Sequence, residues 1–337
     1  MKALVIKKPG HAEIASVAEP ASRDHALLLK VRMVGFCGSD LNTFRGNNPM
    51  VSYPRILGHE VSATIVEGSS TDPSLAAGVD VTLSPYTNCG GCAACRRGRP
   101  NACKFNETLG VQRDGALTEY IRVPPEKIYT AKLSLTELCL VEPLTVGFHA
   151  VARGRVTSGD TVPIFGCGGV GLGAVAASSF RGATTVAVDV SDEKLETARA
   201  AGALHVINTT REDLHARLAE LTGGHGPDVV IEAIGLPETF RAAVEEVSFT
   251  GRVVYIGYAK QPVAYETKLF VQKELDILGS RNALPEDFRA VIRMFEERCF
   301  PVEDAISSVI ALEDAPEALR AWSDDPSRVK KIMVRLD

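Results

Sequence analysis

The stretch TVPIFGCGGVG, residues 161–171, places a glycine-rich turn directly after a run of apolar residues. Gly166, Gly168 and Gly171 fit the pattern G-x-G-x-x-G, and the small-residue segment AVAASSF follows. A turn between a strand and a helix exposes backbone N–H groups at the helix N-terminus, where a pyrophosphate group binds. Asp189 ends the next apolar run, where a carboxylate accepts hydrogen bonds from the adenosine ribose and repels a 2′-phosphate. The stretch therefore predicts a binding site for NAD rather than NADP.

Apolar runs alternate with helical segments on the C-terminal side of this turn. TTVAVDV is followed by DEKLETARAAG, and DVVIEAIG is followed by PETFRAAVEEV. Such alternation is typical of a doubly wound parallel sheet whose strands are buried on both faces. We therefore expect a dinucleotide-binding domain over residues 151–280. Pro163 removes a hydrogen-bond donor from the first of these strands, so we expect a local distortion there.

The first 150 residues follow a different pattern. Short runs rich in β-branched residues, such as KALVI, VSATIVEG and DVTLS, are separated by glycine and proline. This pattern predicts a β-rich domain over residues 1–150, with loops long enough to carry chemistry. A chain of 337 residues is also longer than one hydrophobic core usually organises, which favours two domains.

Composition argues against several classes of function. The net charge of -5 and the isoelectric point near 5.9 give no reason to expect a nucleic-acid or anionic-membrane partner. The N-terminus, MKALVIKKPG, has an apolar stretch far too short for a signal peptide or a membrane span. We therefore expect a cytoplasmic protein that binds neither nucleic acid nor membrane. In that compartment the eight cysteines stay reduced, which favours metal binding over disulfides.

Four of the cysteines lie together in NCGGCAACRRGRPNAC, residues 88–103. Cys89, Cys92, Cys95 and Cys103 have the spacing C-x2-C-x2-C-x7-C. Two-residue gaps let a tight turn direct successive thiolates at one centre, and a distant fourth cysteine completes the tetrahedron that zinc prefers. A full set of four protein ligands predicts a structural zinc. An iron–sulfur cluster and four unligated thiols are the alternatives.

Three further motifs carry residue types that bind zinc. They are GFCGSD at 35–40, ILGHEV at 56–61 and LVEPLTVGFHA at 140–150. Cys37, His59 and Glu142 would provide three ligands, and an open fourth position is typical of a catalytic zinc. Neighbours on a regular strand point to opposite faces, so His59 and Glu60 could share one metal only if Gly58 lets the backbone leave strand geometry. Each of these residues alone is more often a core or surface residue than a ligand.

Together, these motifs resemble those of zinc-dependent medium-chain dehydrogenases/reductases. The resemblance covers essentially the whole chain and is carried by GFCGSD, GHE, the four-cysteine segment, VEPLTVGFHA, GCGGVG with Asp189, and GSRN at 279–282. It is greatest to the branch of sorbitol dehydrogenases and of sugar-acid dehydrogenases such as L-galactonate or L-gulonate 5-dehydrogenase. It implies an α/β fold with a GroES-like catalytic domain and a Rossmann cofactor domain, and residues 281–337 returning to the catalytic domain.

The resemblance also implies one catalytic and one structural zinc per subunit. It assigns Cys37 and His59 to the catalytic zinc, with Glu142 binding that zinc directly or through its water. It makes Glu60 a residue that approaches the metal and exchanges with water. Which of the two glutamates is a direct ligand stays open.

The expected reaction is the oxidation of an alcohol by NAD. Zinc acts as a Lewis acid on the substrate hydroxyl, and hydride leaves the carbon for the nicotinamide. Many relatives pass the proton through a histidine, but Asn42 occupies that place here, so Ser39 is expected to take the proton. The residues expected to contact the dinucleotide are Gly166, Gly168, Gly169, Val170, Gly171, Asp189, Lys194 and Ile256.

Arg281, in GSRNALPEDF at 279–288, indicates the substrate class. A guanidinium offers two parallel donors to a carboxylate, and GSRN resembles sugar-acid dehydrogenases more than polyol enzymes. We therefore expect a hexonate that is oxidised at a secondary hydroxyl, at the junction of the two domains. Arg281 could instead meet a cofactor phosphate or pair with an acidic residue at that junction.

Other activities are compatible with the same motifs. Dehydrogenation of a polyol of the sorbitol or galactitol type, or of L-threonine, would use the same residues. Outside the enzymes, a regulatory protein that binds NAD and zinc is the alternative, although such a protein would not need Cys37, Ser39, His59 and Glu142 together. A small-molecule substrate and a homo-oligomer, either a dimer or a tetramer, complete the expectation.

Overall fold

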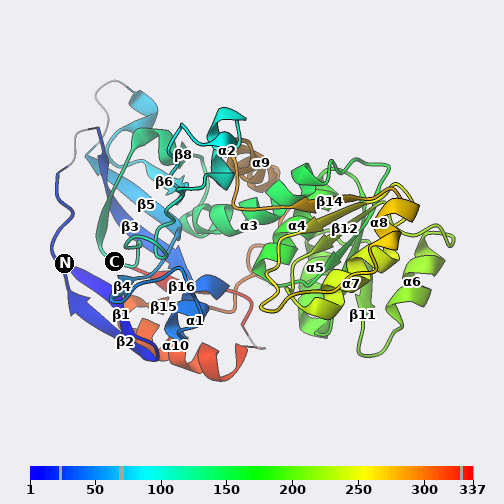
Figure 1. Cartoon of the computed structure of the whole chain (residues 1–337). Coiled ribbons are helices and arrows are strands. Elements are labelled where there is room, and N and C mark those ends of the chain that lie inside the picture. Colours follow the sequence, from blue (N-terminus) through cyan, green and yellow to red (C-terminus); the bar gives the residue numbers. More distant parts are fainter. Residues whose placement is uncertain (23–24, 68–71, 327–328, 337) are drawn as a thin grey trace. The chain divides into compact units, whose positions relative to one another are not determined.

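The protein is described by a computed structural model, shown in Figure 1, that covers residues 1–337 apart from 23–24, 68–71, 327–328 and 337. The chain divides into two compact units. We call the first the catalytic unit; it contains Met1–Glu142, Leu284–Glu296 and Ala305–Asp337. We call the second the nucleotide unit; it contains Pro143–Ala283 and Glu297–Asp304. The chain passes from one unit to the other inside helix α3 (Leu135–Arg153).

The catalytic unit is built mainly from β-strands. A small sheet has the order β2 (His11–Ser16), β1 (Lys2–Lys8), β4 (Arg55–Ile56). The larger, seven-stranded sheet has the order β15 (Ser308–Ala311), β16 (Ile332–Arg335), β3 (Leu27–Gly35), β5 (Glu60–Glu67), β6 (Asp80–Leu83), β8 (Ile128–Thr130), with β7 (Tyr120–Val123) also paired to β3. Its helices are α1 (Gly38–Phe44), α2 (Ala93–Arg96), α9 (Pro285–Glu296) and α10 (Ala315–Asp324).

Strand β3 shows how the sequence builds this sheet. Its first residues alternate between buried and half-buried, with Leu27, Leu29 and Val31 in the core and Lys30 and Arg32 facing outward. This period of two is what a strand with one buried face requires. The register with β5 shifts between Val31 and Met33, which is a β-bulge, and beyond that point the strand is buried on both faces.

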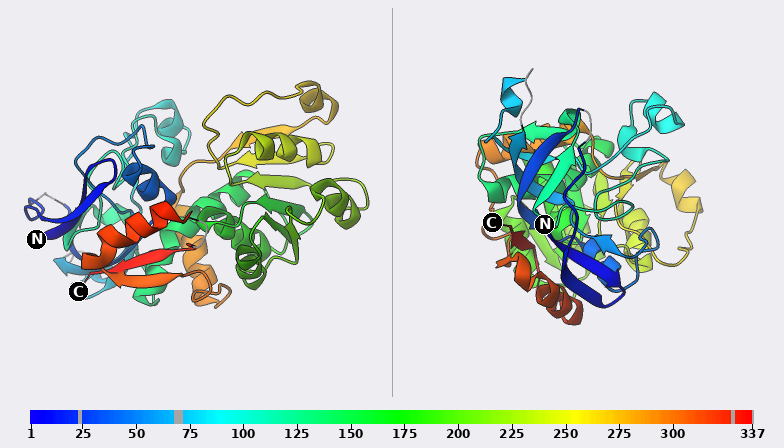
Figure 2. Two further views of the ribbon diagram at one scale, coloured as in Figure 1. Left: turned by 90° about the horizontal axis from the view of Figure 1, so that it is seen from below. Right: turned by 90° about the vertical axis from the view of Figure 1, so that its left-hand side faces the viewer.

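The C-terminal tail completes the same sheet. Strand β16 pairs with β3 in antiparallel orientation, with Val334 opposite Val34. Helix α10, red in Figure 2, lies beside β2 and α1. The indole of Trp322 on α10 stacks on the ring of Phe36 with 6.3 Å between ring centroids. The tail therefore contributes to the core next to the GFCGSD motif.

The nucleotide unit contains one parallel sheet with helices around it (Figure 1). The strand order is β11 (His205–Asn208), β10 (Thr184–Asp189), β9 (Thr161–Phe165), β12 (Val229–Glu232), β13 (Arg252–Tyr255), β14 (Asp276–Gly279). The helices are α4 (Gly169–Phe180), α5 (Asp192–Ala200), α6 (Leu214–Leu221), α7 (Pro237–Glu246) and α8 (Lys268–Gln272). The order reverses between β9 and β12, and ligands bind such sheets at the carboxyl ends of the strands beside this point.

Pro163 disturbs β9 less than expected. It stays in continuous register with β10, opposite Val186. The prediction of a local distortion is therefore wrong for the pairing of β9 with β10. Pairing of β9 with β12 involves only Ile164 and Phe165, which lie after the proline. Pro163 has no N–H to donate, and the fold tolerates this because the hydrogen-bonded pairing with β12 starts after the proline.

Helix α3 is long and apolar enough to cross a membrane by length and composition. However, 78% of its apolar window is buried within the structure, which is typical of a core helix. The nucleotide unit has a similarly apolar but shorter helix, α4, packed on β9 and β10.

Candidate active site and metal centres

The catalytic unit brings three predicted ligands together. The ligand atoms of Cys37, His59 and Glu60 all lie within 4.8 Å of one another. Cys37 caps the N-terminus of α1, His59 directly precedes β5, and Glu60 is the first residue of that strand. A thiol, an imidazole and a carboxylate thus converge from two motifs that are distant in the sequence.

Gly58 makes this arrangement possible. Its φ of 97° is open to glycine but strained for other residues, and a Cβ atom there would lie 2.7 Å from Cγ1 of Val34. The backbone therefore departs from strand geometry just before β5 begins at Glu60. This is the departure that the sequence requires if His59 and Glu60 are to face one site.

Asp40 ties the two motifs together, and the sequence analysis did not identify it. Its Oδ2 accepts a hydrogen bond of 2.8 Å from the N–H of Cys37, and its Oδ1 accepts one of 3.4 Å from the N–H of Gly58. The side chain is fully buried, and burial raises the pKa of Asp40. The sequence signal was present, because an acidic residue three positions after a helix cap is typical of a capping box.

Glu60 is held by a second residue that the sequence analysis missed, Lys331. The Nζ of Lys331 lies 2.7 Å from Oε1 and 2.6 Å from Oε2 of Glu60, and it donates a 3.0 Å hydrogen bond to the carbonyl of Phe36. Both charged side chains are buried. Burial alone would lower the pKa of Lys331, but the Glu60 carboxylate raises it above its usual value, so Lys331 stays protonated.

Glu142, on helix α3, is held by Tyr86. The hydroxyl of Tyr86 donates a hydrogen bond to Oε1 of Glu142, and both side chains are buried. Burial raises the pKa of Glu142 to about 7, while the nearby His59 opposes this rise. Glu142, the third ligand in the set predicted from the sequence, is outside the group of ligand atoms that lie within 4.8 Å of one another, but it shares the electrostatic cluster of Cys37 and His59.

This cluster fits a divalent cation. Burial alone would lower the pKa of His59, yet Cys37, Asp40 and Glu142 together raise it well above its usual value, which shows how much negative charge surrounds the imidazole. Among the described residues, Nδ1 of His59 is buried without a hydrogen-bond partner. Thiolate, imidazole and carboxylate are the donors that zinc binds, and a catalytic zinc takes three protein ligands. The residues present thus fit a catalytic zinc.

Ser39 lies on the first turn of α1, two residues after the N-cap Cys37. Its Oγ is buried and has no hydrogen-bond partner among the residues that the structure describes. A hydroxyl can both accept and donate a proton. Asn42, half-buried on the same helix, stands where many relatives have a relay histidine, and its carbonyl accepts a 2.8 Å hydrogen bond from the N–H of Asn47.

The four clustered cysteines also converge, as their spacing predicts. Their sulfur atoms all lie within 4.8 Å of one another, with 3.6 Å between those of Cys92 and Cys95 and 3.9 Å between those of Cys92 and Cys103. Tetrahedral zinc with Zn–S bonds of about 2.3 Å holds its sulfurs about 3.8 Å apart. An iron–sulfur cluster would hold them farther apart, because its cysteines bind different iron atoms. The geometry therefore fits a single structural zinc.

Backbone hydrogen bonds support thiolates in this lobe. The N–H of Cys92 donates to Sγ of Cys89 at 3.3 Å, and the N–H of Phe105 donates to Sγ of Cys103 at 3.3 Å. The backbone N–H of Cys95 and that of Lys104 lower the pKa of Cys92 to about 6. Burial raises the pKa of Cys95 to about 11, so a bound cation would favour the ionised form of this thiol at neutral pH.

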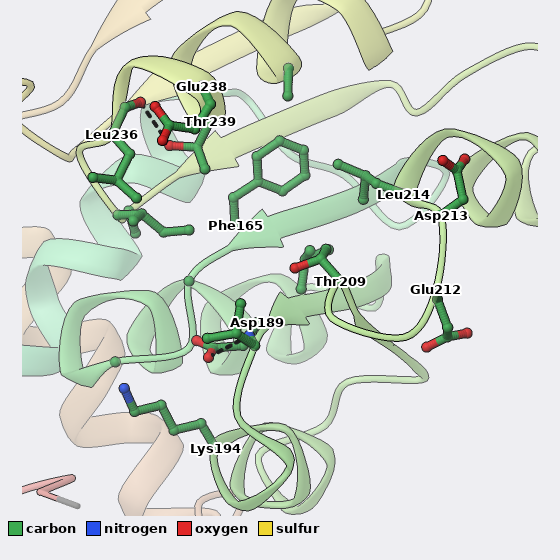
Figure 3. Close-up of a pocket in the computed structure, with 17 residues that line it drawn as sticks. Phe165, Asp189, Lys194, Thr209, Glu212, Asp213, Leu214, Leu236, Glu238 and Thr239 are labelled. Carbon is green, nitrogen blue, oxygen red and sulfur yellow. Dashed lines mark hydrogen bonds between the residues drawn. The ribbon is translucent and has the colours of Figure 1, made fainter. Parts of the chain in front are cut away.

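The nucleotide unit has a cavity of about 690 Å³ at the carboxyl ends of its strands, shown in Figure 3. Gly166, Gly168, Asp189 and Lys194, all predicted cofactor contacts, line it. The remaining predicted contacts are not among the residues that line it: Gly169, Val170 and Gly171 form the first turn of α4, and Ile256 directly follows β13. The acidic residues Glu212, Asp213 and Glu238, which the sequence analysis did not single out, also line the cavity.

The glycine turn leaves no room for side chains. Gly166 has a φ of 93°, and a Cβ atom there would lie 2.6 Å from Cγ1 of Ile234. A Cβ atom on Gly171 would lie 1.7 Å from the carbonyl oxygen of Gly166. These glycines allow β9 and α4 to meet in a turn tight enough to expose backbone N–H groups to a pyrophosphate.

Asp189 is fixed in this cavity before any ligand binds. Its Oδ2 accepts a 2.8 Å hydrogen bond from the N–H of Cys167, and its Oδ1 accepts bonds of 2.8 and 3.0 Å from the N–H groups of Val190 and Ser191. Figure 3 shows Lys194 beside it. The carboxylate at the end of β10 is thus pre-oriented toward the cavity that it lines.

Arg281 follows β14 at the carboxyl end of the same parallel sheet. The N–H of Ser280 donates a 2.9 Å hydrogen bond to the carbonyl of Tyr255, which extends the pairing of β13 and β14 by one residue. The Arg281 side chain is exposed, and Asn282 after it adopts a φ of 52°.

Comparison with known proteins places these sites in one family. The family model of the alcohol dehydrogenase GroES-like domain matches residues 23–133, and that of zinc-binding dehydrogenases matches residues 169–297. L-galactonate-5-dehydrogenase of Escherichia coli K12 is 34% identical over 88% of both chains. Sorbitol dehydrogenase of Bacillus subtilis 168 is 34% identical over 99% of this chain and 97% of that one.

A solved structure supports the same assignment. Short chain alcohol dehydrogenase (rspB) from E. coli CFT073, complexed with NADH, superposes with a TM-score of 0.91 at 28% identity, over 100% of this chain and 99% of that one. The predicted family, the GroES-like and Rossmann fold, and the zinc and NAD cofactors are thereby confirmed. The chain belongs to the zinc-type medium-chain alcohol dehydrogenases, a family of zinc-dependent NAD oxidoreductases that act on alcohols, polyols and sugar acids.

Proposed function

We propose that this dehydrogenase oxidises a secondary hydroxyl of an acyclic sugar acid, a hexonate such as L-galactonate or L-gulonate, to the ketone. The observation that carries the proposal is the position of Arg281, two residues after β14 ends at Gly279. All six strands of this sheet run parallel, so their carboxyl ends lie at the edge that also carries the glycine turn at Gly166. Arg281 thus adds a positive charge to the edge at which this fold binds ligands.

The chemistry of arginine favours a carboxylate there. Its planar guanidinium offers two parallel N–H donors that match the two oxygens of a carboxylate. The similarity to the L-galactonate-5-dehydrogenase of E. coli supports the same substrate class. Arg281 already takes part in a contact within the protein. We therefore assign it two roles, this internal contact and the binding of the substrate carboxylate.

We assign the catalytic roles to residues of the catalytic unit. Cys37 and His59 would hold the catalytic zinc, with Glu142 and Glu60 as the carboxylates beside it. When bound, the zinc supplies a Lewis acid for the substrate hydroxyl, and NAD accepts the hydride. Ser39 would relay the hydroxyl proton outward, releasing its own proton as it accepts the substrate's, because its buried Oγ has no hydrogen-bond partner among the described residues.

The other roles follow from the remaining clusters. Cys89, Cys92, Cys95 and Cys103 would hold the structural zinc that orders their loop. Asp189 would bind the adenosine ribose, with the glycine turn around the pyrophosphate. The acidic lining of the cavity adds further negative charge that disfavours the extra phosphate of NADP.

A polyol is the second candidate substrate. The sorbitol dehydrogenase of B. subtilis reaches the same identity as the galactonate enzyme and covers more of the chain. A hexitol has the same secondary hydroxyl but no carboxylate, so the zinc site would accept both classes. Arg281 is the residue that would separate them.

The structural zinc is tested by replacing one cysteine. Cys95→Ser should reduce the zinc content by about one of two ions and lower the free energy of unfolding by several kcal/mol, because a structural zinc contributes folding energy directly. Metal analysis and denaturant unfolding measure the two effects. Cys299→Ser, at an exposed cysteine outside the lobe, is the control and should change neither. A folded Cys95→Ser variant with two zinc ions would refute the assignment.

Cofactor choice is tested at Asp189. Asp189→Ser should weaken NAD binding and reduce the preference for NAD over NADP by roughly tenfold to a hundredfold, since a like-charge contact costs a few kcal/mol. The measurement is the ratio of kcat/KM for the two cofactors. Asp189→Asn removes the charge and keeps the Oδ1 acceptor for Val190 and Ser191, at the cost of the Oδ2 acceptor for the N–H of Cys167, so it preserves more of the loop geometry than Asp189→Ser does. An unchanged ratio in both variants would mean that another residue discriminates.

The substrate class is tested at Arg281. Arg281→Ala should lower kcat/KM for a hexonate roughly tenfold to a hundredfold, because a hydrogen bond to a charged group contributes about 1.5–3 kcal/mol. The matching hexitol should lose little. Arg199→Ala, at an exposed arginine near the end of α5, is the matched control and should affect neither substrate. Equal losses on hexonate and hexitol would defeat the carboxylate assignment and favour polyol oxidation.

A further inference from the structure

Tyr86 lies at the point where the cysteine lobe joins the rest of the catalytic unit. It precedes Cys89 by three positions in the stretch YTNC. Its backbone pairs with that of Thr108, on the segment that leaves the lobe. Next to it, the N–H of Thr87 donates to the carbonyl of Glu107 at 3.1 Å, and the N–H of Glu107 donates to Oγ1 of Thr87 at 2.7 Å. Tyr86 is thus fixed by both chain segments that border the lobe.

From this position the Tyr86 side chain reaches the catalytic cluster. The residue is 6% exposed, and its hydroxyl donates to Oε1 of Glu142, which is 3% exposed. A hydrogen bond from a hydroxyl to a buried carboxylate is among the strong ones in proteins. A phenylalanine would fill the same space, so packing alone does not account for the hydroxyl.

The hydrogen bond defines the orientation of the carboxylate. The terminal torsion of a glutamate side chain has a broad, roughly two-fold energy profile, so its plane is poorly determined without a partner. A donor on Oε1 selects one orientation of this plane. Glu142 is rigid at its other end, because it lies on the buried helix α3. The Glu142 side chain is therefore fixed at its backbone by helix α3 and at its carboxylate by Tyr86.

We propose that Tyr86 is a positioning residue that orients the Glu142 carboxylate toward the catalytic metal. The inference rests on the proposed role of Glu142 beside that metal. Residues that orient a ligand by hydrogen bonding typically change metal affinity about tenfold to a hundredfold when they are removed. Tyr86 also gives the cysteine lobe a direct connection to the catalytic centre, because the segments that border the lobe hold its backbone.

The test removes one hydroxyl from each of two tyrosines in the catalytic unit. Tyr86→Phe deletes the donor to Glu142. Tyr53→Phe is the matched control, because the hydroxyl of Tyr53 donates a 2.6 Å hydrogen bond to the carbonyl of Thr43 instead. In the full-length enzyme with the structural zinc in place, the affinity of the catalytic site for Zn²⁺ and Co²⁺ is measured by competition with a chelator. The visible absorption spectrum of the Co²⁺ form reports the ligand arrangement.

Tyr86→Phe should weaken metal affinity about tenfold to a hundredfold and change the Co²⁺ spectrum. Tyr53→Phe should leave both unchanged, even if both variants lower the melting temperature. NAD affinity should be the same in all forms. A Tyr86→Phe enzyme with wild-type metal affinity and spectrum would overturn the inference.

A double-variant cycle with Glu142→Ala separates the inference from the role on which it rests. If Tyr86 acts through Glu142, adding Tyr86→Phe to Glu142→Ala should weaken metal binding no further. A full additional loss in the double variant would show that Tyr86 acts by another route and would overturn the inference. If Glu142→Ala alone keeps wild-type turnover and metal affinity, the proposed role of Glu142 fails first and the inference fails with it.

Discussion

The buried ion pair between Glu60 and Lys331 is the constraint around which the catalytic unit is organised. Lys331 belongs to the C-terminal tail, whose strand β16 pairs with β3, and it places its ammonium group against the first residue of β5. Removing one partner of a buried pair leaves an uncompensated charge at a typical cost of about 3–5 kcal/mol. The tail is therefore an electrostatic component of the centre as well as a part of the sheet.

Negative charge explains the other contacts of this centre. Asp40 holds the backbone of Cys37 and Gly58, and Tyr86 holds Glu142. Each carboxylate is fixed by donors that are already in the fold. A divalent cation held by Cys37 and His59 would balance the charge of these carboxylates. The nucleotide unit follows the same principle, because backbone N–H groups hold the Asp189 carboxylate before a dinucleotide binds.

Local patterns in the sequence were sufficient to predict much of this arrangement. The two-residue cysteine spacing predicts a tetrahedral centre, and the glycine pattern followed by Asp189 predicts the nucleotide cavity, because in both cases the residues act within one turn or one strand–helix unit. Gly58 was predicted for the same reason, since only the geometry of its neighbours in the chain was needed.

The contacts that the sequence analysis missed join distant segments. Lys331 is 271 positions from Glu60, and Tyr86 is 56 positions from Glu142. A lysine before a C-terminal strand and a tyrosine before a cysteine motif carry no local signal of a buried partner. Pro163 is the opposite case, because the sequence predicted a distortion that the pairing with β10 does not have. Whether the missing N–H matters depends on where the pairing with β12 begins, and that is not a local property of the sequence.

The most direct test of this account is the rate of NADH formation by the wild-type enzyme with hexonates, hexitols and L-threonine as alternative substrates. A hexonate such as L-galactonate or L-gulonate should give the highest kcat/KM, at least about tenfold above the matching hexitol, as expected for one additional charge-assisted contact. Oxidation of hexitols or L-threonine with no activity on any hexonate would contradict this expectation.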